Sequence, residues 1–177
     1  ASGDTITIPS GATFTNSGTT SSITISGALT VDGGTVKLDG NYPTGTDNVA
    51  LGDTALDSVQ AGGNNNVAIG NKAGTAITTG DANTSIGGCA LHSNTTASDN
   101  TAIGFNNSFN NTTGTANTAI GRSTFYNNTS GSSNTEVGNE SINANTTANN
   151  NTAVGYCALN AYQTGVSSVA VACGALA

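Results

Sequence analysis

The sequence predicts an all-β protein, a parallel β-solenoid of about eight coils of 17 residues each. A five-residue motif, typified by Asn100-Thr-Ala-Ile-Gly104, begins at residues 48, 66, 83, 100, 117, 134, 151 and 168. Successive starts differ by 18 residues once and by 17 residues six times. A period this regular indicates that each copy forms one turn of a stack. Positions below are counted from the motif Asn as position 1.

Composition agrees with a stack of repeats rather than a conventional globular domain. Of the 177 residues, 35% are hydrophobic and 7% are charged, and 24 are glycine. This is too little apolar material for a large core. Disordered chains share such compositions, but they lack apolar residues at fixed positions of a repeat. We therefore expect a folded solenoid.

The first 46 residues lack the motif but alternate apolar and polar residues, as in Thr5-Ile-Thr-Ile8 and Ser22-Ile-Thr-Ile25. They are expected to form an irregular N-terminal β segment or cap. The turn-forming residues 41–45 mark its boundary. The repeat solenoid is then expected over residues 47–177.

Within each repeat, position 4 is always aliphatic and is predicted to form the core, with a second apolar site at position 9. Position 5, Gly in seven of the eight copies, is expected to turn the chain between them. Ala at position 3 is then expected to face outward and to allow close packing of a trimer. Glu136 departs from that column. The predicted position-4 core is Leu51, Ile69, Ile86, Ile103, Ile120, Val137 and Val154.

In-register stacking places identical side chains above one another, which favours amides over charged groups. A column of Asn can donate to one coil and accept from the next, whereas a column of like charges repels itself. A row of Asn and Thr that binds ice or sugar is the functional alternative. The predicted structural ladder is Asn48, Asn66, Asn83, Asn100, Asn117, Asn134 and Asn151.

Three cysteines cannot all pair within one chain. Cys89 and Cys157 share a repeat position but lie four coils apart, too far for a disulfide. Cys157 and Cys173 are expected on neighbouring coils, one position out of register, so a disulfide between them is possible. The alternative is three small buried thiols.

Charge and motif content exclude several classes of function. The formal charge is −7, with three Lys and Arg in all, so nucleic-acid binding is not expected. No apolar stretch is long enough to span a membrane. No catalytic pair of carboxylates, triad or zinc site is expected, because the acidic residues do not cluster and His92 is the single histidine. The repeat has no Asp at a fixed position, so bound calcium is not expected. No cofactor is expected either, and no stacked aromatic track is apparent.

Sequons of the form Asn-x-Ser/Thr recur at the predicted polar turns. We expect these turns to be exposed, so glycans are sterically allowed if the chain is extracellular. The repeating sequon residues are Asn94, Asn111, Asn128 and Asn145.

The phrase Asn-Thr-Ala-Ile-Gly, followed by a small residue and Leu at positions 8 and 9, resembles the head repeats of trimeric autotransporter adhesins. It is still more similar to repeats in tail fibres of marine bacteriophages, where an opening like Thr5-Ile-Thr-Ile-Pro-Ser-Gly-Ala12 also occurs. The resemblance covers residues 48–176 and implies a left-handed parallel β-roll. It further implies a trimeric stalk or adhesive head.

These observations favour a structural, non-enzymatic fibre component, extracellular or on a virion surface. Its expected partners are further copies of itself, as a homotrimer or stacked head to tail, and cell-surface glycans. The first residue is Ala, so processing or a longer parent chain is expected, and the apolar residues 169–177 are expected to stack on another subunit or on further chain. Two alternatives are a self-assembling bacterial surface filament, with glycosylated sequons, and a β-helix that binds or cleaves polysaccharide.

Overall fold

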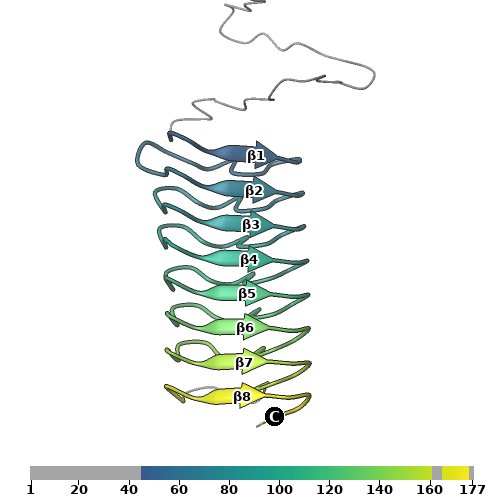
Figure 1. Ribbon diagram of the computed structural model, residues 1–177. Coiled ribbons are helices and arrows are strands. Elements are labelled where there is room, and N and C mark those ends of the chain that lie inside the picture. The colour runs from purple at the N-terminus through teal and green to yellow at the C-terminus, as the bar shows by residue number, and fades with distance from the viewer. Residues whose placement is uncertain (1–44, 161–164, 176–177) are drawn as a thin grey trace, which may run out of the picture. The chain divides into compact units, whose positions relative to one another are not determined.

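The protein is seen in a computed structural model that describes residues 45–160 and 165–175, and the described part is a parallel β-solenoid (Figure 1). Eight strands of three residues each pair in chain order, every one parallel to the next, and the described residues contain no helix. The predicted all-β solenoid is therefore confirmed. Residues 1–44 of the predicted N-terminal segment lie outside the described residues. The strands are β1 (Val49–Leu51), β2 (Val67–Ile69), β3 (Thr84–Ile86), β4 (Thr101–Ile103), β5 (Thr118–Ile120), β6 (Thr135–Val137), β7 (Thr152–Val154) and β8 (Val169–Val171).

Strand register converts the 17-residue period into columns of like residues. Thr101 pairs with Thr118, and Ile103 pairs with Ile120, so positions 2 and 4 stack on their own copies. The first coil is one residue longer, yet Val49 still pairs with Val67. The extra residue lies between Gln60, whose N–H still donates to Thr78 O at 2.8 Å, and Gly63, which accepts from Asn48. We call the part of each coil that leads from the corner back to the next strand the return segment. The return segment therefore absorbs an insertion without disturbing the columns.

The strand residues that face the core and those that face solvent are the reverse of the prediction. Leu51, Ile69, Ile120 and Val154 are 53, 37, 39 and 36% exposed, and the other three predicted core residues are half-buried. Successive strand residues face opposite sides, and the ladder Asn at position 1 faces inward, so position 3 also faces inward and position 4 outward. The buried position-3 column is Ala68, Ser85, Ala102, Ala119, Glu136, Ala153 and Ala170.

The core pairs small residues at position 3 of the strand with large residues at position 9, which lie in the segment after the corner. Ala102 packs in one cluster with Ala90 and Leu91, for example. Position 9 fills the interior as predicted: Leu56, Leu91, Phe125, Ile142 and Leu159 are all buried. Small residues at position 3 leave room for such side chains, and Glu136 is the one large residue in that column. This agrees with a strand that turns its large aliphatic residue outward.

Gly at position 5 makes the corner that follows each strand. Gly104 has φ +133°, and a Cβ built there would lie 2.2 Å from the carbonyl oxygen of Gly121 in the next coil. Both the backbone conformation and the close approach of the coils therefore require glycine. In the last coil, Ala172 occupies this position and does not have a positive φ.

Candidate functional surfaces

The predicted Asn ladder is buried and connects every coil to the next. The Asn117 backbone N–H donates to Asn100 Oδ1 at 3.0 Å, and its side-chain amide donates to the same oxygen at 3.1 Å. Asn117 Nδ2 also donates to Gly131 O at 2.8 Å, across its own coil. Because the amides are buried and paired, this column holds the fold together and offers nothing to a ligand. The equivalent backbone bond to the preceding ladder Oδ1 is made by Asn66, Asn83, Asn100, Asn134, Asn151 and Ser168.

A second buried Asn column lies at position 12, where exposed turns were expected. Asn128 Oδ1 accepts from the Gly131 N–H at 2.9 Å, and its Nδ2 donates to Asn111 Oδ1 at 2.7 Å. The first two coils carry Val59 and Ile77 at this position, and these apolar residues were the available signal that the column is internal. The expectation of accessible sequons is therefore wrong, because Asn94, Asn111, Asn128 and Asn145 are all buried.

Glu136 is a carboxyl group enclosed in the alanine column. It is 0% exposed, lies between Ala119 and Ala153 of the neighbouring strands, and neither carboxyl oxygen has a hydrogen-bond partner. Burial raises its pKa well above the ordinary value, since the charged form loses its hydration. The expectation that position 3 forms an outer packing face is therefore wrong.

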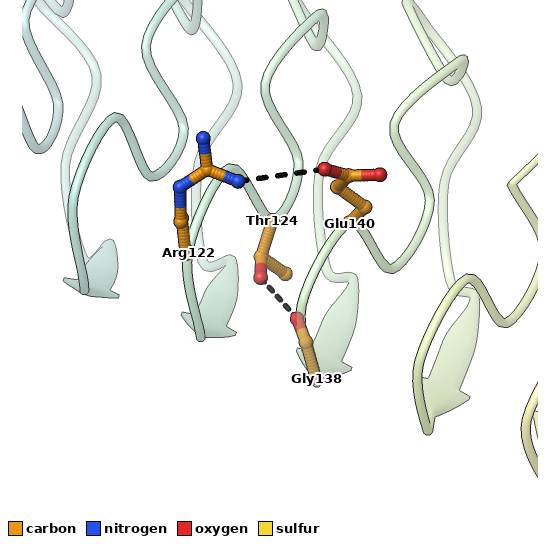
Figure 2. A network of polar contacts seen from close by, with 4 residues as sticks. All are labelled: Arg122, Thr124, Gly138 and Glu140. Carbon is orange, nitrogen blue, oxygen red and sulfur yellow. Dashed lines mark hydrogen bonds and ion pairs between the residues drawn. The ribbon is translucent and has the colours of Figure 1, made fainter.

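The corner after β5 carries polar contacts between neighbouring coils (Figure 2). Arg122 Nη1 lies 3.6 Å from Glu140 Oε1, with the Arg side chain 63% exposed. Beside this ion pair, the Thr124 hydroxyl donates to the Gly138 carbonyl. An exposed ion pair of this length contributes at most about 1 kcal/mol. Glu140 is thus outside the solenoid and Glu136 inside it, so the two carboxylates do not form a pair.

The three cysteines are free thiols in this structure, so the disulfide considered between Cys157 and Cys173 is absent. The Gly174 N–H donates to Tyr156 O at 2.9 Å, and the Cys157 N–H makes the equivalent bond to Asn139 O at 3.1 Å. Gly174 therefore stacks on Cys157, and Cys173 stacks on Tyr156. The pKa of Tyr156 is raised, chiefly by a hydrogen bond with Cys157.

The outer face of the sheet carries an uninterrupted apolar column. All eight position-4 residues are Leu, Ile or Val, and position 2 contributes only Val and Thr to the same face. No charged side chain therefore lies on the outer face of the eight strands, although the chain has a formal charge of −7. Five of the nine large hydrophobic residues that are exposed in the described part of the chain belong to position 4 of this face: Leu51, Ile69, Ile120, Val154 and Val171.

An aromatic column, not anticipated from the sequence, lies at position 10 of three successive coils. The His92 and Phe109 ring centroids are 4.5 Å apart with the planes 7° from parallel, and Phe109 and Tyr126 are 5.3 Å apart with planes at 14°. The signal was present, since residues 92, 109 and 126 are separated by 17. The column is not visible from the tyrosines alone, because Tyr126 and Tyr156 occupy different repeat positions.

The described residues contain no group of three His, Cys, Asp or Glu side chains placed to hold a metal ion. Across the same residues there is no helix with the length and apolar character needed to cross a bilayer. No protein-family model, curated protein or solved structure matches the chain.

Proposed function

We propose that the chain is a structural, non-enzymatic subunit of an extracellular or virion-borne fibre, built by self-association through the outer face of its sheet. The observation that carries the proposal is the exposed aliphatic column at position 4. Within the stack, Ile69, Ile120 and Val154 are 37, 39 and 36% exposed, and Leu51 and Val171 at its two ends are 53 and 65% exposed. The other three residues of the column are half-buried, so the strip faces water along its whole length. Contiguous apolar surface on a soluble protein marks an interaction site.

The chemistry of the face favours a second copy of the same chain. A face without charges does not repel its own copy, although the rest of the chain is acidic. The face also has no charged group with which to recognise a polar partner. Identical coils present identical strips, so contact between copies extends as far as the stack itself. Symmetric contact of this kind builds closed homo-oligomers, either dimers or the trimer implied by the family resemblance.

Self-association is tested by light scattering on the purified chain, with a charge placed on the strip. Ile120 is 39% exposed and points outward, so Ile120→Lys leaves the core unchanged. We expect the native chain to have the mass of two or three copies and the variant to be monomeric. The cost of burying an unpaired ammonium group in the interface far exceeds what the contact provides.

Thr113→Lys is the matched control, because Thr113 is exposed in a return segment and belongs to no strand. It adds the same charge and is expected to leave the oligomer intact. A native chain that is still monomeric at about 100 μM contradicts the proposal, because a dissociation constant above that concentration is weaker than that of nearly all specific interfaces. Equal dissociation of the oligomer in both variants also contradicts the proposal, since dissociation would then depend on the net charge of the chain and not on the position of the added lysine. Micrographs of antibody-labelled fibres distinguish a virion fibre from a bacterial filament.

A further inference from the structure

A groove crosses the return segments of four successive coils, on residues that belong to none of the eight strands. It is an open depression of about 540 Å³, lined mainly by two columns of side chains. Asn110 and Asn127 form the first column, at position 11, and Thr112, Thr129 and Thr146 form the second, at position 13. Its volume is within the usual range of ligand sites.

The groove offers side-chain oxygens and no free strand edge. The Asn110 backbone N–H donates to Tyr126 O at 3.1 Å, and the Thr112 N–H donates to Thr129 O at 3.0 Å. These bonds already join one coil to the next, so an added peptide strand has no backbone groups with which to pair.

Two of the three threonine hydroxyls in the groove already donate their hydrogens to the next coil. Thr112 Oγ1 donates to Thr129 O at 2.9 Å, and Thr129 Oγ1 donates to Thr146 O at the same distance. Each hydroxyl oxygen still has lone pairs that can accept. The threonine column is therefore an array of acceptors, and it suits a ligand that presents hydroxyl donors.

The groove is electrically neutral. No Asp, Glu, Lys or Arg lines it. The aromatic column immediately precedes the lining residues in the chain, and its histidine, His92, has a pKa lowered by burial and then by the charge of Lys72. At neutral pH that ring is therefore uncharged. A polyanion finds no cations in the groove, which argues against nucleic acid and sulfated glycans.

We propose that this groove binds an extended, uncharged oligosaccharide along the stacking direction. Sugar hydroxyls donate to Thr112 and Thr129, and a further hydroxyl donates to Asn127 Oδ1, which keeps a lone pair while it accepts from Asn110 Nδ2 at 3.5 Å. Asn127 Nδ2 already donates to Asn143 O at 2.9 Å, so this residue acts as an acceptor. Threonine methyls and Ala144 contact the C–H faces of the sugar rings. The threonine column repeats the same hydroxyl on three successive coils at about the strand spacing of 4.8 Å, so a polymer with regularly repeated hydroxyls meets an equivalent threonine on each of them.

The test uses the whole purified chain and a panel of neutral hexasaccharides of glucose, galactose and mannose, titrated by calorimetry, with a heparin hexasaccharide for comparison. We expect at least one neutral hexasaccharide to bind with Kd below about 1 mM, and heparin not to bind. Thr129→Val retains the shape of the side chain but removes the acceptor. It is expected to weaken binding about tenfold, the effect of a lost hydrogen bond left unreplaced.

Thr78→Val is the matched control. Thr78 occupies the same column and makes the same bond to the next coil, to Thr95 O at 2.9 Å, but it lies outside the groove lining. Both variants therefore lose one equivalent contact between coils, and only Thr129→Val should lose affinity. Binding of heparin alone, no binding by any neutral hexasaccharide, or equal weakening by both variants overturns the proposal. Since the groove contains no strand residue, this outcome is separate from that of the self-association test.

Discussion

Glu136→Ala is expected to stabilise the solenoid at neutral pH by about 1 to 3 kcal/mol, the usual cost of a buried polar group without a partner. Most substitutions in a core destabilise, so an increase is a distinctive result. The substitution extends the alanine column, and the neighbouring Ala119 and Ala153 show that coils close around alanine at this position. Thermal or urea unfolding followed by circular dichroism measures the change.

The same residue makes stability depend on pH, and the sign follows from the direction of its pKa. Burial raises the pKa of Glu136 in the folded state, so the folded chain holds its proton at pH values where the unfolded chain, with a pKa near 4.3, has lost it. This contribution to stability is fully present below about pH 4 and is lost as the pH rises toward the folded-state pKa. The folded protein is thus expected to be more stable in acid than at neutral pH, as far as this group is concerned.

Glu136→Gln isolates that dependence, because it retains the size of the side chain and removes the ionisation. The difference in stability between the native chain and this variant should grow between pH 4 and neutral pH. Glu140→Gln is the control: it removes a carboxylate from the surface, where Glu140 faces Arg122, and leaves Glu136 in place. If the native chain and Glu136→Gln lose stability in parallel across this pH range, the assignment of the dependence to Glu136 is wrong.

Gly104→Ala is expected to destabilise by about 3 kcal/mol or more, which exceeds most single substitutions. Two costs add: φ +133° is closed to alanine, and its Cβ would lie 2.2 Å from the backbone oxygen of Gly121, which cannot move without displacing the next coil. Urea denaturation of the variant and the native chain provides the comparison.

Gly174→Ala is the control that carries neither of these two costs in full. Gly174 has φ +64°, but a Cβ built there meets no atom within 4 Å. It therefore carries only the cost of the left-handed conformation, about 1 kcal/mol, which Glu140 and Cys157 accept at the same repeat position. Equal losses for the two variants would show that neither the φ of Gly104 nor the close approach of the coils is limiting at the position-5 corner.

The period, the parallel stacking and the Asn ladder could be predicted because each follows from spacing alone. Which side of the strand faces inward could not, because hydropathy assigns Ile103 to the core and Asn100 to the surface. The structure places Ile103 half-buried on the outer face and buries Asn100. The buried amides obtain their partners from their own coil and from the coil next to it. These hydrogen bonds form only in the folded stack, so the sequence alone does not show that the amides are paired. Ala at position 3 and Leu91 at position 9 were the available clue, since a narrow interior needs one small and one large residue.

The candidate surfaces were less predictable, because they arise from residues that are distant in the chain. His92 and Tyr126 become neighbours of Phe109 only when three coils are superposed. The groove beside them likewise combines residues from four coils. Glu136 was visible as an exception in its column, but its enclosure depends on the orientation of the strand.

The longer first coil has a consequence for how such a chain can change over generations. Its additional residue, between Gln60 and Gly63, leaves Val49 paired with Val67. The strand side of the coil thus tolerates only whole-repeat changes, whereas the return side tolerates single insertions. Duplication of one repeat-length stretch of the gene lengthens the protein without a new kind of contact. Small insertions at the return turn alter what the surface displays while the scaffold stays the same.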